Sequence, residues 1–394
     1  MIILNSNITT PLSSNVIEAM KPFRDEAVDL SSVDKFNQSA LKAYKEAIDK
    51  IYLSIRADDE DDIILTSSVS EATSQIFYSV YLKYILTGRK NSIIISQRAP
   101  IEEIKIARFL ESQGVRVHRI PVTIDGTFDI DVFKEYISSK TALVSLPLVD
   151  DESGVIQPLE EVSQICSLYN VALYSNANSA IGVIPVDVAR NSVDFLSFSA
   201  NSLFGPKDIA ALYIKKNAAI ELQPLIYGKD FEQAGLREMP RDIAKVIGFG
   251  KALEDAIDAL EFDIEDVREL RDNLEQSLLE IEGAYSLAPW ALRVPNISIM
   301  AFENVHASIL KDYLASKDIL IYSFATLKSP HFERVSLVEL NSLPSYLKHC
   351  VVGFALNTQN SEEEIETTIK EVKEAVKNIR EISVNCKEES NGKS

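Results

Sequence analysis

The stretch best suited to chemistry is the polar run of residues 197–207, which follows the mainly apolar residues 193–196. An apolar run of this length that ends in polar and turn-forming residues is typical of a buried strand entering a loop. Ser199, Asn201 and Ser202 would therefore present hydroxyl and amide groups at a strand end. Ser202 as a hydrolase nucleophile would need the Gly-X-Ser-X-Gly turn, which is absent here. The run favours ligand binding over serine-type hydrolysis.

Metal-binding and thiol chemistry have little support in the sequence. Its four histidines are far apart and share no motif with one another or with the three cysteines. Zinc sites need closely spaced ligand pairs, and an odd number of distant cysteines does not form a disulfide framework. Cys166 falls on the apolar side of a predicted helix and is interpreted as a core residue. We therefore expect no metal site, and a reducing cytoplasmic environment.

The chain is acidic, with 40 Lys and Arg against 59 Asp and Glu and a net charge of −19 over 394 residues. A field of this sign repels nucleic acid and anionic membranes unless basic residues are gathered locally, and no such patch is present. No apolar run is long enough to span a membrane, and the first residues do not resemble a secretory signal. Nucleic acid is thus disfavoured as the main ligand.

Strand-like and helix-like stretches alternate through the first part of the chain. A helix is predicted over residues 36–54 from apolar positions at helical spacing, and shorter apolar runs then alternate with amphipathic segments up to residue 174. This alternation predicts a mostly parallel sheet with helices on its faces. A long helix is predicted over residues 250–282, followed by short strands and helices typical of a smaller α+β domain. Ser361 and Glu364 form a predicted capping box for the last helix.

Several ordered motifs resemble cysteine desulfurases, which are class V members of the fold-type I pyridoxal-phosphate (PLP) enzymes. The motifs are Thr9-Thr10-Pro11, Thr66-Ser67 with Ser70-Glu71-Ala72, Gly154-Val155-Ile156-Gln157-Pro158, Ile184-Pro185-Val186-Asp187, and Gly205-Pro206-Lys207. The resemblance implies a large PLP-transferase-like domain with a mostly parallel seven-stranded sheet and a smaller C-terminal α+β domain. It places the large domain at residues 15–252 and the small domain at residues 1–14 and 253–385, with a disordered tail at 386–394.

The positions that carry the family's chemistry differ from its pattern. Ser202 stands where the family has the lysine that forms the Schiff base, Asn176 where it has the aspartate that pairs with the pyridinium nitrogen, and Ala99 where it has the ring-stacking histidine. Leu327 and Gly353 replace the sulfur-accepting cysteine and the substrate-binding arginine. Lys207 matches a structural lysine of the family. The resemblance thus predicts a vestigial pocket at Ser70, Ala99, Asn176, Ser179, Ser199, Asn201 and Ser202.

Two further features also argue against a working PLP site. The Asp150-Asp151-Glu152 run would add negative charge near a dianionic cofactor, and only 13 of 394 residues are glycine, which suggests a filled pocket. We therefore expect a PLP-free, catalytically inactive homologue with no catalytic residues. It would act as a homodimeric structural, regulatory or interaction module with an unidentified protein partner.

Two alternatives remain open. The remodelled cleft could bind another small molecule, or it could retain class V aminotransferase or cysteine desulfurase activity. An open, ligand-sized cavity would favour a cleft that binds a small molecule, and side chains packed across the cleft would exclude it.

Overall fold

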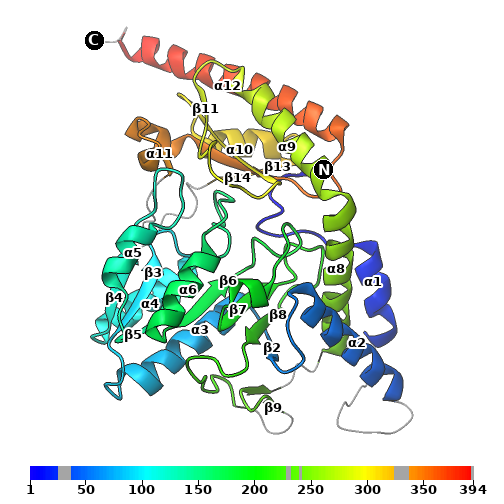
Figure 1. Ribbon diagram of the computed structural model, residues 1–394. Helices are drawn as coiled ribbons and strands as arrows, with labels where there is room; N and C mark the ends of the chain where they lie inside the picture. Colours follow the sequence, from blue (N-terminus) through cyan, green and yellow to red (C-terminus); the bar gives the residue numbers. More distant parts are fainter. Residues whose placement is uncertain (25–36, 228–231, 239–241, 324–336, 392–394) are drawn as a thin grey trace.

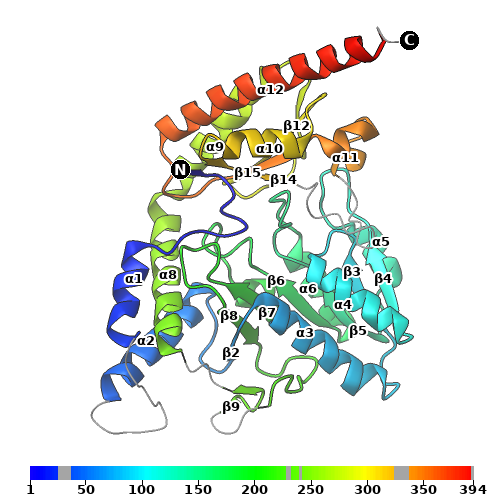
Figure 2. The same cartoon turned by 180° about the vertical axis from the view of Figure 1, so that it is seen from behind.

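The computed structural model describes residues 1–24, 37–227, 232–238, 242–323 and 337–391. Figure 1 shows a larger lobe built on a sheet with helices on both faces, and a smaller lobe above it formed mainly by the C-terminal part of the chain. The view from behind in Figure 2 shows the N-terminal segment passing between the two lobes.

The central sheet has seven strands in the order β2-β8-β7-β6-β5-β3-β4. All neighbouring pairs are parallel except those of β8, which runs antiparallel to both β2 and β7. Strands such as Ile93-Ile94-Ile95 are buried on both faces, which is why they are continuously apolar. The strands are β2 (Asp62–Thr66), β3 (Ser92–Ser96), β4 (Arg116–Ile120), β5 (Thr141–Ser145), β6 (Ala172–Asn176), β7 (Phe195–Ser199) and β8 (Ala210–Ile214). The predicted α/β fold with a mostly parallel seven-stranded sheet is confirmed.

Helices cover the two faces of this sheet. They are α2 (Gln38–Ser54), α3 (Val69–Val80), a π-helical turn (Tyr81–Ile85), α4 (Ile101–Ser112), α5 (Ile130–Tyr136), α6 (Leu159–Tyr169) and α7 (Val188–Asn191). The predicted helix at 36–54 is thus present as α2, which packs against α8 (Ile243–Phe262), as does α1 (Ser14–Met20).

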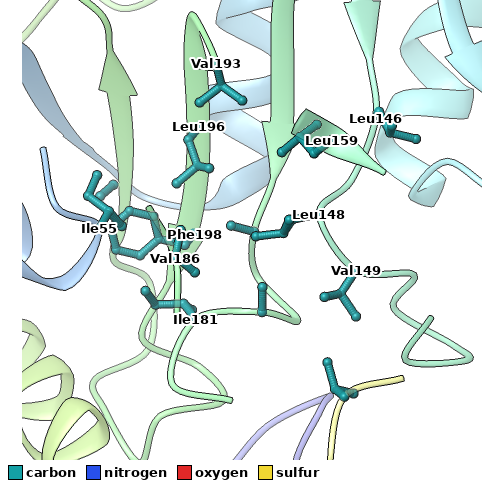
Figure 3. Close-up of a cluster of buried hydrophobic side chains, with 14 of the residues drawn as sticks. Ile55, Leu146, Leu148, Val149, Leu159, Ile181, Val186, Val193, Leu196 and Phe198 are labelled. Atoms are coloured by element: carbon teal, nitrogen blue, oxygen red, sulfur yellow. The ribbon is translucent and has the colours of Figure 1, made fainter. Parts of the chain in front are cut away.

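The core of the larger lobe lies between the sheet and its helices (Figure 3). Leu146, Leu196 and Phe198 from the sheet region are buried together with Leu159 of α6 and Ile181 of the loop that follows β6. Cys166 belongs to the same core at 2% exposure, as predicted, and burial raises the pKa of its thiol. Burial of this apolar surface holds the strand ends in fixed positions relative to one another.

The long acidic helix predicted over 250–282 is instead two helices. Helix α8 ends at Phe262, and α9 (Ile264–Leu279) begins after Asp263. The break lets each half bury a different face: α8 packs on α1 and α2, whereas Leu274 and Leu278 of α9 enter the core of the smaller lobe. One straight helix could not have reached both cores, so tertiary packing decides the break.

The smaller lobe is built on a four-stranded antiparallel sheet in the order β11-β12-β15-β14. Its strands and helices are β11 (Ala284–Ser286), β12 (Ile297–Phe302), α10 (Ala307–Ala315), β14 (Tyr322–Ser323), α11 (Leu337–Leu340), β15 (Val351–Ala355) and α12 (Glu362–Asn391). The N-terminal strand β1 (Ile2–Ile3) pairs with β13 (Ile319–Leu320) of this lobe. Short strands β9 (Glu232–Gln233) and β10 (Arg237–Glu238) form a separate hairpin.

Two predictions about the ends of elements can be compared with the structure. The capping box is confirmed, because the Glu364 N–H donates to Ser361 Oγ at 3.3 Å and the Ser361 N–H to Glu364 Oε2 at 3.4 Å. The tail predicted to be disordered from residue 386 instead continues α12 to Asn391. The domain boundary predicted at 252/253 falls inside α8 and stays a prediction. Within the described residues, no helix is long and apolar enough to cross a membrane.

Candidate functional site

A cleft lies at the carboxyl ends of the central strands, facing the smaller lobe. Its cavity has a volume of about 300 Å³, within the usual range for small-molecule sites. The larger lobe contributes Asn176 from the end of β6, with Asn178 and Ser179 from the loop that follows, and the smaller lobe contributes Lys311 and Tyr322. Ligands of open α/β sheets bind at this edge, because the loops that can hold them emerge there. The expectation of a filled pocket is therefore wrong.

Two asparagines organise the floor of the cleft. The Asn176 side chain accepts a hydrogen bond from the Asn178 N–H at 3.0 Å and donates one to Glu102 Oε1 at 3.2 Å. Asn178 Oδ1 accepts from the Ser199 N–H at 3.1 Å and from its hydroxyl at 2.7 Å. Asn176 and Ser199 are buried, so this network fixes the strand-end turns of β6 and β7 against each other. Glu102, at the start of α4, brings a carboxylate into the cleft.

The negative charge of the acidic loop beside the cleft is partly balanced by a buried arginine. Arg98 donates from Nε to Asp150 Oδ2 at 2.8 Å and from Nη2 to Asp150 Oδ1 at 2.9 Å. Its Nη2 also lies 2.9 Å from Glu152 Oε2. The side chains of Arg98 and Asp150 are 3% and 2% exposed, so the pair is nearly free of solvent screening. The predicted excess of negative charge at 150–152 is thereby reduced.

Tyr322 forms the wall of the cleft on the side of the smaller lobe. A Cβ atom added to Gly353 would lie 2.1–2.5 Å from three atoms of the Tyr322 ring, so the ring occupies the space where a larger residue 353 would extend. The Tyr322 hydroxyl donates to the backbone oxygen of Glu152 at 2.9 Å and so joins the two lobes. Burial, together with nearby Glu152, raises the pKa of this phenol well above its usual value. An arginine at position 353 would therefore have to displace the Tyr322 ring.

The N-terminus of α3 borders the cleft through Val69. Ser67 donates from its N–H and its hydroxyl to Glu71 Oε2 at 2.7 and 2.6 Å, and Arg237 also pairs with this carboxylate. Burial tends to raise the pKa of Glu71, but the hydrogen bonds from Arg237 and Ser67 outweigh it and lower the pKa. Ser70 is exposed, and its hydroxyl is available at the helix start.

The polar run of 197–207 has a mainly structural arrangement. Lys207 donates from Nζ to the backbone oxygens of Thr10 and Asn201, which joins the N-terminal segment to the turn, and burial lowers the pKa of its ammonium. This agrees with the structural role predicted for Lys207. Asn201 Oδ1 and Ser202 Oγ are buried without a hydrogen-bond partner in the described part of the chain.

The structure brings together only part of the predicted pocket. Asn176 and Ser179 line the cleft, Ser199 supports it through Asn178, and Ser202 lines a different cavity. Ser70, Ala99 and Asn201 are not among the lining residues, although Val69 and Pro100 beside the first two are. Leu327 lies outside the described residues.

Three charged residues of this region were not predicted from the sequence as site residues: Arg98, Glu102 and Lys311. Arg98 and Glu102 flank Pro100 between a predicted strand and the next helix, so their place at a strand end could have been noticed. Nothing in the sequence brings Lys311 near residue 176, because their proximity depends on how the two lobes pack.

The fold and the cleft define the class of protein: the α/β architecture with a smaller lobe over the strand ends is that of fold-type I PLP enzymes. A structure titled "NIFS-LIKE PROTEIN" superposes with a TM-score of 0.86 at 24% identity, covering 95% of this chain and 99% of that one. The apo structure of the cysteine desulfurase from Thermococcus onnurineus NA1 gives a TM-score of 0.79 at 20% identity, covering 96% of this chain and 95% of that one.

The chain belongs to the Aminotransferase class-V family, whose match covers residues 2–368. It is 31% identical over 377 residues to the protein named cysteine desulfurase IscS of Dictyoglomus turgidum, covering 95% of this chain and 94% of the relative. It is 27% identical over 382 residues to the cysteine desulfurase NifS of Azotobacter vinelandii, covering 96% and 94%.

These matches correct two expectations. The relatives are named as cysteine desulfurases over nearly the whole chain, and nothing in the matches marks an inactive protein, so the interpretation as an inactive interaction module is wrong. The expectation of no cofactor is also wrong, because the family is PLP-dependent. The joint loss of the family's site residues and the low glycine content had suggested a filled pocket, whereas the structure has an open cleft with a carboxylate at Glu102 and an amine at Lys311.

Proposed function

We propose that this chain is a PLP-dependent enzyme of the cysteine desulfurase type, which binds its cofactor and a small amino-acid substrate in the cleft below Tyr322. The observation that carries the proposal is the open cavity of about 300 Å³ at the strand ends of a chain that belongs to this family. A cleft of this size, lined by asparagine, serine, lysine and carboxylate side chains, suits a small polar ligand.

The residues present fit a cofactor held without a covalent bond at position 202. Ser202 cannot form an imine, and its hydroxyl is buried away from the cleft lining. Glu102 supplies a carboxylate of the kind that pairs with a protonated ring nitrogen, and Asn176 holds that carboxylate through its Nδ2. The start of α3 borders the cleft through Val69, whose backbone N–H is a candidate to hold a phosphate. In the turn after β7, Asn201 Oδ1 is a further buried oxygen that has no hydrogen-bond partner among the described residues.

PLP, when bound, acts as an electron sink that stabilises negative charge on the substrate's α-carbon. The protein's own residues would bind the cofactor and the substrate and orient them in the cleft. Tyr322 and Ser323 close the cleft on the side of the smaller lobe and limit access of water. Lys311 offers an amine within the cleft, which suits it to hold an anionic group of a ligand.

The experiment is a titration of the purified chain with PLP, followed by absorbance and by mass spectrometry under native conditions, and then a sulfide assay with L-cysteine. Glu102→Gln keeps the shape of the side chain and removes its charge, so it should weaken PLP binding about tenfold, as expected for one charge-assisted hydrogen bond. Glu135→Gln on the exposed side of α5 is the matched control and should leave binding unchanged. Absence of saturable PLP binding by the unmodified chain would contradict the proposal.

A homodimer in a reducing, cytoplasmic environment is part of the same proposal. Cys166 and Cys350 are free and buried, which suits such an environment. Light scattering of the purified chain would test the dimer. The further protein partner stays a prediction, which affinity purification from the source cells would test.

A further inference from the structure

A second cavity lies at the junction of the two lobes, separate from the cleft. Its volume is about 450 Å³, and none of its lining residues lines the cleft. It is bounded by the end of α8 and the start of α9, by residues 202–204 of the strand-end turn, and by residues 356–359 that follow β15. An occupant would therefore touch both lobes at once.

The charged side chains that line this cavity are all acidic. Asp255, Asp258 and Asp263 line it, and the described lining includes no lysine or arginine. Lys251 lies 2.7 Å from Asp255 and pairs with it from outside the lining. Asp258 and Asp263 have no cationic partner among the described residues. Two uncompensated carboxylates in a half-enclosed space favour a cationic occupant.

A second observation, independent of the carboxylates, also indicates a ligand. Asn296 lines the cavity and is 7% exposed; its Nδ2 donates to the Leu356 oxygen at 3.1 Å, and its Oδ1 has no partner within the described structure. Ser202 lines the same cavity, and its Oγ is likewise buried without a partner there. A buried polar atom with no partner is costly, so each of these oxygens would gain from a donor.

The rest of the lining is mixed: it has uncharged polar residues at both lobes and an apolar part that includes the aromatic side chain of Phe262. Phe262 is 74% exposed and lies where α8 ends, while Val183 and Leu203 contribute aliphatic surface. An aromatic face attracts an ammonium group, and aliphatic walls suit a methylene chain. In the part of the chain that the structure describes, no group of three or more His, Cys, Asp or Glu could hold a metal ion. The chemistry thus fits an organic cation better than a bare metal.

We propose that this junction cavity binds an aliphatic diamine or polyamine. Its ammonium groups meet Asp258 and Asp263 on the helical side and the oxygens of Asn296 and Ser202 on the other, and its methylene chain lies against Val183, Leu203 and Phe262. This site is independent of the proposed PLP chemistry, because it shares no lining residue with the cleft.

The test is calorimetric titration of the full chain with cadaverine at physiological salt, with 1,5-pentanediol as a neutral analogue of the same length. Saturable binding of cadaverine and none of the diol is expected. Asp258→Asn and Asp263→Asn together should weaken cadaverine binding at least about tenfold, the size expected for loss of charge-assisted contacts. Neither change should unfold the chain, because Asp258 is exposed and Asp263 makes no side-chain capping bond.

Asp266→Asn is the matched control. It removes the same charge from the first turn of α9 but does not line the cavity, so binding should change less than about twofold if the contacts are local. An equal loss in this control would mean that cadaverine is attracted only by the net charge of −19, and the proposal would fail. No saturable binding by the unmodified chain, or binding of the diol equal to that of the diamine, would also overturn it. Each single variant is measured separately, with its melting temperature.

Discussion

The buried ion pair between Arg98 and Asp150 offers the sharpest prediction about stability. Arg98→Met keeps much of the aliphatic length of the side chain and removes its charge. Asp150 Oδ1 would still accept from the N–H and hydroxyl of Ser153, each at 2.7 Å, and from the Glu152 N–H at 3.2 Å. Its carboxylate would remain in a site that is 2% exposed, without the guanidinium that now meets both of its oxygens.

The expected loss is about 3–5 kcal/mol of unfolding free energy, the range for removing one partner of a buried pair. The cost arises mainly from the uncompensated charge that is left behind, and less from the contact itself. Arg98→Met with Asp150→Asn should therefore be less destabilised than Arg98→Met alone, since the double variant buries no uncompensated charge at position 150.

The assay is equilibrium unfolding in urea, followed by far-ultraviolet circular dichroism and extrapolated linearly to water. Arg119→Met is the matched control: Arg119 also binds a carboxylate with two nitrogens, 2.6 Å each from Glu111, but both side chains are about one-third exposed. Exposed pairs contribute roughly 0–1 kcal/mol. If Arg98→Met were no more destabilising than Arg119→Met, burial would not be what makes the first pair strong, and the reasoning would be refuted.

Three further predictions concern packing, acid stability and capping. Gly353→Ala should destabilise the smaller lobe by about 1–3 kcal/mol in the same urea assay, because its Cβ would overlap the Tyr322 ring, and adding Tyr322→Leu should recover part of the loss. Burial favours a raised pKa for Glu275, but Arg293, Ser298 and Ser286 outweigh it and lower the pKa. Stability from this group is therefore present above the unfolded value of about 4.3 and is lost as the pH falls through the lower folded value. Glu275→Gln should remove that part of the acid slope in unfolding measured from pH 6 to pH 2, and an unchanged slope would contradict the assignment. Ser361→Ala should lower stability by about 1 kcal/mol through loss of the cap on α12, and a change below about 0.3 kcal/mol would show that the cap contributes little.

The sequence determined the fold class and several local features. Continuous apolar runs separated by amphipathic helices predict a buried parallel sheet, and the seven strands follow that pattern. The capping box at Ser361 and the burial of Cys166 were also predictable, because each depends on neighbours only a few residues away or on the face of a single helix. The motif ending in Lys207 correctly indicated a structural role, since it lies beside its own turn.

The candidate site was decided by tertiary structure. Whether the cleft is open or filled depends on the separation of the two lobes, and the identities of the substituted residues do not give that distance. Arg98 neutralises Asp150 across 52 positions of sequence, Glu102 reaches Asn176 across 74, and Lys311 arrives from the smaller lobe. The break at Asp263 also depends on tertiary structure, because the two halves of the predicted helix pack into two separate cores. Local patterns are set by contacts along the chain, whereas charge compensation and cavity volume are set by contacts between distant segments, which only the folded chain brings together.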